Sequence, residues 1–132
     1  MQTFLPYKNF IESAICLDYK RLGKQRVEAK QIIEILEGKP SRWKNHPAVK
    51  MWVGYIDTLK VYYNIIVQEW INKGYKNNMK FFQPSDVIEY PPWLGDDKFH
   101  ASHRSNLLRK DPKWYSQFGW TEPNNLPYVW PV

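Results

Sequence analysis

A helical repeat between Leu17 and Leu36 is the feature that most limits how this chain can fold. Its apolar residues recur at a spacing near 3.6, the period of an α-helix, and they are Val27, Ala29, Ile32, Ile33, Ile35 and Leu36. Gly38-Lys39-Pro40 follows, and a glycine and then a proline beyond the last turn stop a helix. The stretch therefore predicts a helix that is anchored in the core and ends near Gly38.

Three other stretches have helical character. One begins after Leu5-Pro6, and whether it is continuous with the Leu17 helix stays open; a second runs from Pro47 to Asn72 or Lys73 before Gly74. A third covers about 97–109 and stops at Asp111-Pro112. The segments 81–95 and 121–132 are rich in proline and aromatic residues, which favours irregular structure. We expect an all-α fold, a compact single domain over residues 1–132 with about three main helices and long connections that wrap them.

The residue composition excludes several classes of protein. A single cysteine, Cys16, lies in an apolar run, which predicts a buried thiol and a reducing compartment. No apolar stretch is long enough to cross a membrane, and the first residues lack the pattern of a signal peptide. We expect a soluble, intracellular, cytoplasmic monomer of bacterial or phage origin. Paired-cysteine, glycine-rich phosphate and zinc-protease motifs are missing, so we expect no cofactor and no metal.

The charge pattern indicates a polyanionic partner. The net charge is +6, and residues 1–50 hold 10 Lys and Arg against 5 Asp and Glu, so that +5 of the +6 lies there. A basic field of this kind is typical of proteins that bind nucleic acid. Double-stranded DNA is the partner that we expect, with contacts to its phosphates.

Two polar groups of residues are candidates for a site. Asp18, Arg21, Gln25 and Glu28 fall on one helical stripe, flanked by the cations Lys20, Lys24 and Arg26. An exposed face of ion pairs is the alternative interpretation of that stripe. The second group is His100, His103, Arg104, Asn106 and Arg109, where histidine and arginine suit phosphate contact or proton transfer and a core histidine is the alternative. His46 precedes Pro47 and is better explained as a helix cap than as a catalyst.

Two sequence blocks resemble a known family. "RKDPKWYSQFGW", residues 109–120, resembles "RPTWYKYYG" near the end of the phage-type pyrimidine-dimer DNA glycosylases called endonuclease V, and "DYKRLGKQRV", residues 18–27, resembles their "EYRELPRV". The turns "NHP" and "NKGY" are also similar to those of the broader family. The resemblance implies a compact all-α fold that binds duplex DNA and acts on damaged or modified pyrimidines.

The resemblance also implies a DNA glycosylase with abasic-site lyase activity, which forms an imine with the N-terminal α-amine and then cleaves the strand by β-elimination. An α-amine has an ordinary pKa of about 7.7–8.0 against about 10.4 for lysine, so it is the better nucleophile near neutral pH. Gln2 is bulky and opposes removal of the initiator methionine, so the amine would be that of Met1. The family's catalytic glutamate has no counterpart, because Lys20 and Arg21 occupy the positions of its arginine-glutamate pair. Asp18 and Glu28 are the possible substitutes, and we favour Asp18 for its closeness to the cations.

These considerations give the following predicted site. The catalytic residues are Met1, Asp18, Arg21 and His103, and the DNA-binding residues are Lys20, Lys24, Gln25, Arg26, His46, His100, Arg104, Asn106 and Arg109. Two alternatives stay open: a non-catalytic DNA-binding protein of the same fold, and a small nucleotide-directed enzyme or inhibitor with an aromatic pocket. For Trp93, Trp114, Trp120 and Trp130, packing is favoured over stacking on DNA.

Overall fold

The computed structural model describes all residues, 1–132, and it is built from helices without any strand. The elements are α1 (Phe10–Cys16), α2 (Tyr19–Leu36), α3 (Pro47–Lys50), α4 (Ile56–Asn72), α5 (Asp97–Lys110), α6 (Pro112–Tyr115) and the 3₁₀ turn η1 (Ser116–Phe118). The predicted all-α fold is confirmed, and its three long helices are α2, α4 and α5.

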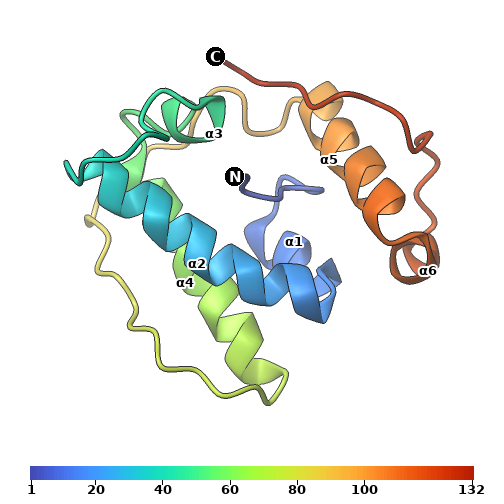
Figure 1. Ribbon diagram of the computed structural model, residues 1–132, viewed down its shortest axis with the longest axis horizontal. Coiled ribbons are helices and arrows are strands. Elements are labelled where there is room, and N and C mark those ends of the chain that lie inside the picture. Colours follow the sequence, from blue (N-terminus) through green and yellow to red (C-terminus); the bar gives the residue numbers. More distant parts are fainter.

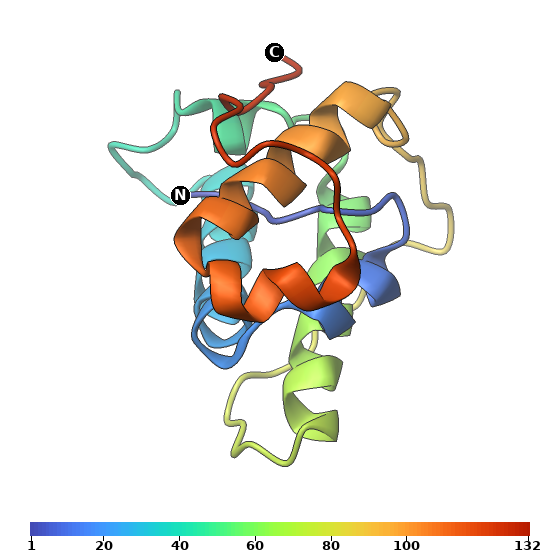
Figure 2. The same cartoon turned by 90° about the vertical axis from the view of Figure 1, so that its right-hand side faces the viewer.

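The arrangement of the long helices leaves a place for the N-terminus. Helices α2 and α4 pack against each other, α1 packs on α4, and α5 lies across from α2 (Figure 1). The first residues of the chain run between α2 and α5, and the C-terminal tail returns along α5 (Figure 2). The N-terminal segment is therefore an inner element of the fold.

The core is a cluster of 21 buried hydrophobic residues, among them Leu22, Ile32, Trp52, Tyr62 and Phe99. They come from all six helices, from the residues before α1, from Leu17 and from the turn after α3. Burial of apolar surface of this extent is the main term that holds helices together in water. Cys16 is also buried, which confirms the prediction of a buried thiol, and burial raises the pKa of that thiol to about 12.

The predicted single helix from Pro47 to Asn72 is wrong, because residues 51–55 form a turn between α3 and α4. Gly54 has φ +85°, a left-handed conformation that residues with a side chain rarely adopt. The turn places Trp52 in the core, where its indole N–H donates to Thr3 Oγ1 at 3.1 Å. The apolar stripe seen in the sequence is therefore shared by two helices that point in different directions.

The first two helices are separate. Leu17 and Asp18 have extended backbones (ψ 137° and 163°), and they turn the chain between α1 and α2. The α5 prediction is confirmed, as is the end of α4 before Gly74. Helix α1 begins later than predicted, at Phe10, with Asn9 as its cap. None of the helices has the length and apolar character needed to cross a membrane.

Candidate functional site

The N-terminal segment, residues 2–6, is held on one side by a glutamine of α2. Gln25 Nε2 donates to Gln2 O at 2.8 Å, and Gln25 Oε1 accepts from the Phe4 backbone N–H at 3.0 Å. The hydroxyl of Tyr62 on α4 lies 2.8 Å from Phe4 O, to which it donates. A buried backbone needs partners for its polar groups, and these side chains supply them where no sheet is present.

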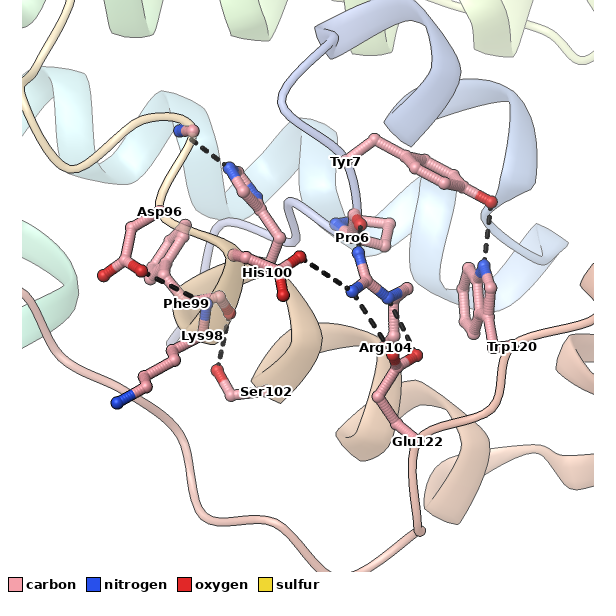
Figure 3. Close-up of polar contacts among 12 residues, drawn as sticks. Pro6, Tyr7, Asp96, Lys98, Phe99, His100, Ser102, Arg104, Trp120 and Glu122 are labelled. Atoms are coloured by element: carbon pink, nitrogen blue, oxygen red, sulfur yellow. Dashed lines mark hydrogen bonds and ion pairs between the residues drawn. The ribbon is translucent and has the colours of Figure 1, made fainter.

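Helix α5 holds the other side of the segment (Figure 3). His103 Nδ1 accepts from the Leu5 N–H at 2.9 Å, and His100 Nδ1 donates to Leu5 O at 2.7 Å. The direction of the second bond follows from His100 Nε2, which accepts from the Gly95 N–H at 2.9 Å. Arg104 donates to Pro6 O at 2.8 Å. The residues from Gln2 to Pro6 are thus fixed by direct hydrogen bonds on both sides.

The positions of His100 and His103 do not suit the roles predicted for them. Both are buried, and burial lowers the pKa of His103 to about 3, with a further contribution from His100. The pKa of His100 is also lowered, mainly by burial. Neither ring reaches a surface where DNA could lie, and both act as neutral anchors of the backbone. The core-histidine alternative describes them better.

A carboxylate of α2 reaches the start of the chain. Glu28 Oε2 accepts from the Gln2 backbone N–H at 3.0 Å. Since three covalent bonds separate that nitrogen from the α-amine of Met1, the amine lies within about 7 Å of the carboxylate. The charge of the N-terminus also lowers the pKa of His46, after burial as the main cause. His46 itself caps α3, with Nδ1 accepting from the Ala48 N–H at 3.0 Å, as the sequence predicts.

The charges of Arg21, Lys24, Arg109 and Glu28 all act on Lys110, and we call the four cations Arg21, Lys24, Arg109 and Lys110 the basic cluster. The pKa of Lys110 is lowered by burial first and then by the charges of Arg21, Arg109 and Lys24, while Glu28 opposes them. Lys24 also forms an ion pair with Glu28 at 3.7 Å. The cluster therefore joins the first half of α2 to the end of α5.

Asp18 lies at the other end of this stripe. Its carboxylate accepts from the Tyr115 hydroxyl at 2.5 Å and from Arg21 at 3.1 Å, and the residue is 7% exposed. Ten residues of helix separate it from Glu28, which is about 15 Å along the axis. Of the two carboxylates considered from the sequence, Glu28 is the one that contacts the N-terminal segment. Asp18 instead joins α6 to α2 and orients Arg21.

The remaining predicted DNA-binding residues are dispersed. Arg104 pairs with Glu122 at 2.8 Å, so its charge is already balanced inside the protein. Asn106 is buried and donates to Ser102 O at 2.8 Å and to Leu126 O in the tail. Gln25 of α2 is also buried, against the N-terminal segment. Arg26 lies on a different face of α2, against Trp70. These positions leave Arg21, Lys24 and Arg109 as the predicted cations that come together.

The four tryptophans considered from the sequence have contacts inside the protein. The indole N–H groups of Trp93, Trp114 and Trp120 donate to Met51 O, Cys16 O and the Tyr7 hydroxyl at 3.2, 2.8 and 2.8 Å. Trp130 packs edge-on against His46, with ring centroids 5.6 Å apart.

Cavities add little to the definition of the site. Met1 lines a small cavity of about 140 Å³ with Gln31, Glu34 and Trp43. A cavity of about 740 Å³ lies between α1, α4 and Tyr90, and none of the predicted site residues lines it. No three His, Cys, Asp or Glu side chains come close enough together to hold a metal ion.

Comparison with known proteins gives a family match that covers the N-terminal part of the chain. The family model described as pyrimidine dimer DNA glycosylase matches residues 1–83, more than half of the chain. The chain belongs to the pyrimidine dimer DNA glycosylase family. No curated protein and no solved structure is significantly similar to it. Membership supports a DNA glycosylase function in general, with DNA as the substrate.

The matched part of this glycosylase family member contains the N-terminal segment, Glu28, Arg21 and Lys24, while Arg109 and Lys110 lie outside it. Sequence reasoning missed Lys110 and ranked Glu28 second. Lys110 directly follows Arg109 at the end of a predicted helix. Basic residues are common at helix C-termini because they offset the helix dipole, so Lys110 did not stand out as a site residue. Nothing in the sequence indicated that Glu28 contacts the N-terminal segment. Its partner there is the backbone N–H of Gln2, and a backbone group is the same at every position of a sequence.

Proposed function

We propose that this glycosylase family member cleaves the glycosidic bond of a damaged or modified pyrimidine in duplex DNA and then acts as an abasic-site lyase. In the first step, the nitrogen of the Met1 α-amine attacks C1′ of the nucleotide. The bond from C1′ to the base breaks, and the base leaves and takes up a proton. The C1′–O4′ bond then breaks as the nitrogen loses its protons and O4′ gains one, which gives an imine between the protein and the opened sugar. In the second step, removal of a proton from C2′ expels the 3′ phosphate by β-elimination.

The observation that carries this proposal is the hydrogen bond from the Gln2 N–H to Glu28 Oε2, 3.0 Å long. It keeps a carboxylate beside the first atoms of the chain, where a group is needed to take and return protons. We therefore give Glu28 the role for which the sequence favoured Asp18. Asp18 keeps an indirect role in the proposal, because its ion pair with Arg21 positions one member of the basic cluster.

The basic cluster supports the binding part of the proposal. Arg21 and Lys24 on the first half of α2 act together with Arg109 and Lys110 at the end of α5, and in this proposal they contact the phosphates beside the attacked sugar. To reach the sugar, the enzyme must distort the duplex, and extruding a nucleotide costs a few kcal/mol. A damaged or poorly stacked base lowers that cost, which favours the lesion over normal DNA.

The experiment is borohydride trapping on duplex DNA that contains one abasic site. We expect a covalent adduct whose digestion products place the link on the N-terminal residue. Glu28→Gln removes the charge of the carboxylate but keeps its size, so the adduct should form at least about ten-fold more slowly, within the range of general acid-base effects.

Two controls make the result specific. Glu37→Gln changes another carboxylate at the end of α2, one that pairs with Lys60 at 3.6 Å, and should trap at the normal rate. An uncleaved extension of two residues before Met1 moves the amine away from Glu28 and should abolish the adduct. An adduct on Lys110 would refute the role of the N-terminal amine, and salt-sensitive binding without any adduct would support the non-catalytic alternative.

A further inference from the structure

A second aromatic and basic surface lies on the opposite face of α2, around Trp70 of α4. The Trp70 ring crosses α2 at Gly23, where an added Cβ would come within 3.0 Å of Cζ3. The Tyr19 ring stacks on Trp70 with centroids 5.3 Å apart and an interplanar angle of 27°, and the Arg26 guanidinium lies 4.1 Å from the centre of the Trp70 ring. Gly23 thus provides the space in which Tyr19, Trp70 and Arg26 pack together.

The aromatic rings at this surface are only partly covered. Tyr19 is 59% exposed, and Tyr75, whose ring meets Tyr19 edge-on at 4.7 Å, is 36% exposed. Trp70 is largely buried, and its indole N–H already donates to Lys76 O at 2.8 Å. Two adjacent tyrosine rings therefore remain open to solvent on a rigid tryptophan base.

Cations without carboxylate partners accompany these rings: the Arg26 guanidinium lies on Trp70, and Lys20 and Lys76 are the chain neighbours of Tyr19 and Tyr75. Lys20, Arg26 and Lys76 form no ion pair within the protein, and the only side-chain bond of Arg26 is to Asn77 Oδ1 at 3.1 Å. Arg26 Nε is buried and has no hydrogen-bond partner. Burial also lowers the pKa of Arg26, and no carboxylate opposes that change. The surface thus offers positive charge that nothing inside the protein neutralises.

We propose that this surface, formed by Tyr19 and Tyr75 with Lys20, Arg26 and Lys76, binds unpaired nucleotides of single-stranded nucleic acid. Exposed aromatic rings bind bases by stacking, and cations beside them bind the phosphates. In a duplex the base faces are already covered by their neighbours, so the tyrosine rings select unpaired bases. Charge complementarity favours this occupant over an apolar protein segment.

The surface is separate from the proposed catalytic site. Tyr19 and Glu28 are nine residues apart on α2, which corresponds to about half a turn of net rotation, so they point to opposite sides of the helix. The proposal therefore stands without the imine chemistry. It also gives Lys20 and Arg26, which lie outside the basic cluster, a nucleic-acid contact of their own.

Fluorescence anisotropy with a labelled short oligothymidylate at low salt tests the proposal on the full chain. Tyr19→Ala should weaken binding by about ten-fold, since loss of one stacked base costs about 1–3 kcal/mol. Tyr19→Phe keeps the ring and should bind normally, and Tyr75→Ala should weaken binding in the same direction. Lys20→Gln should lower the slope of log K against log salt by about 0.7, the value for one phosphate of a single strand.

Tyr90→Ala is the matched control, because Tyr90 is 60% exposed but lies outside this surface. It should bind oligothymidylate like the unchanged protein, and thermal unfolding checks that each variant is folded. The proposal is overturned if oligothymidylate does not bind at low salt, if folded Tyr19→Ala and Tyr75→Ala bind it normally, or if Tyr90→Ala weakens binding equally. A blunt duplex that binds with equal affinity and the same dependence on Tyr19 would overturn the preference for unpaired bases.

Discussion

Acid should destabilise this protein through His103, because burial of the neutral ring fixes the sign of the effect. His103 is fully buried, accepts the Leu5 N–H at Nδ1, and has its pKa lowered from 6.5 to about 3. Protonation would place a charge in the core and remove the acceptor for that backbone group. The unfolded chain therefore binds a proton that the native protein does not, and stability falls as the pH drops below about 6.5.

The magnitude follows from the two pKa values. Between pH 8 and pH 5, His103 alone should lower the free energy of unfolding by about 2 kcal/mol. Each further pH unit down to about pH 3 should remove about 1 kcal/mol more. His100 adds to the fall, because burial also lowers its pKa.

Urea denaturation at several pH values, on the unchanged protein and on His103→Asn, measures this contribution. Asn Oδ1 is attached to Cγ, as His Nδ1 is, so the variant keeps an acceptor near the Leu5 N–H but does not titrate. His103→Asn should be less stable at pH 8, because the smaller side chain leaves a cavity. Its free energy of unfolding should fall about 2 kcal/mol less between pH 8 and pH 5. Parallel curves for the two proteins would refute the assignment of His103 as a buried neutral anchor.

Three further predictions concern other parts of the molecule. Gly23→Ala should lower the melting temperature, because the added methyl group would lie 3.0 Å from the Trp70 ring. Overpacking of this kind costs about 1–3 kcal/mol, whereas the gain in helix propensity is about 1 kcal/mol. A raised melting temperature would contradict this prediction. Tyr115→Phe should cost about 1–3 kcal/mol in urea denaturation, because Asp18 loses a buried hydrogen bond, and unchanged stability would count against that bond. Lys110→Gln should reduce the salt slope of duplex binding by about 1, and an unchanged slope would remove Lys110 from the phosphate contacts.

The fold was largely predictable from local patterns. The periodic residues from Val27 to Leu36 and the stop at Gly38 are local signals, and α2 and α5 lie where such signals predict them. The break between α3 and α4 was missed because apolar residues continue through it, although Gly54 lies within it with φ +85°. The turn also brings Trp52 to Thr3, a residue 49 positions away, and that contact has no local signal.

The sequence predicted which types of residue form the candidate site better than it predicted how they are arranged in space. The excess of cations near Arg21 and Lys24 was visible in the sequence, and the fold adds Arg109 and Lys110 to them. The histidines of α5 have the composition of a catalytic pair, yet both bind the backbone of Leu5. The sequence does not distinguish a core histidine from a catalytic one. Only the burial of the ring and its hydrogen-bond partners do so.

The sequence by itself determined the helices, the basic N-terminal half and the resemblance to the pyrimidine dimer DNA glycosylases, because periodicity, charge and motif depend on residues close together in the chain. Only the tertiary structure decided which carboxylate lies beside the N-terminus and which cations meet. Those choices depend on the path of residues 2–6 between α2 and α5. The side chains of Gln25, His100 and His103 fix this path, because they form hydrogen bonds with backbone groups up to 98 residues away in the chain. Backbone groups are the same at every position, so such contacts leave no pattern in the sequence and arise only once the helices have packed.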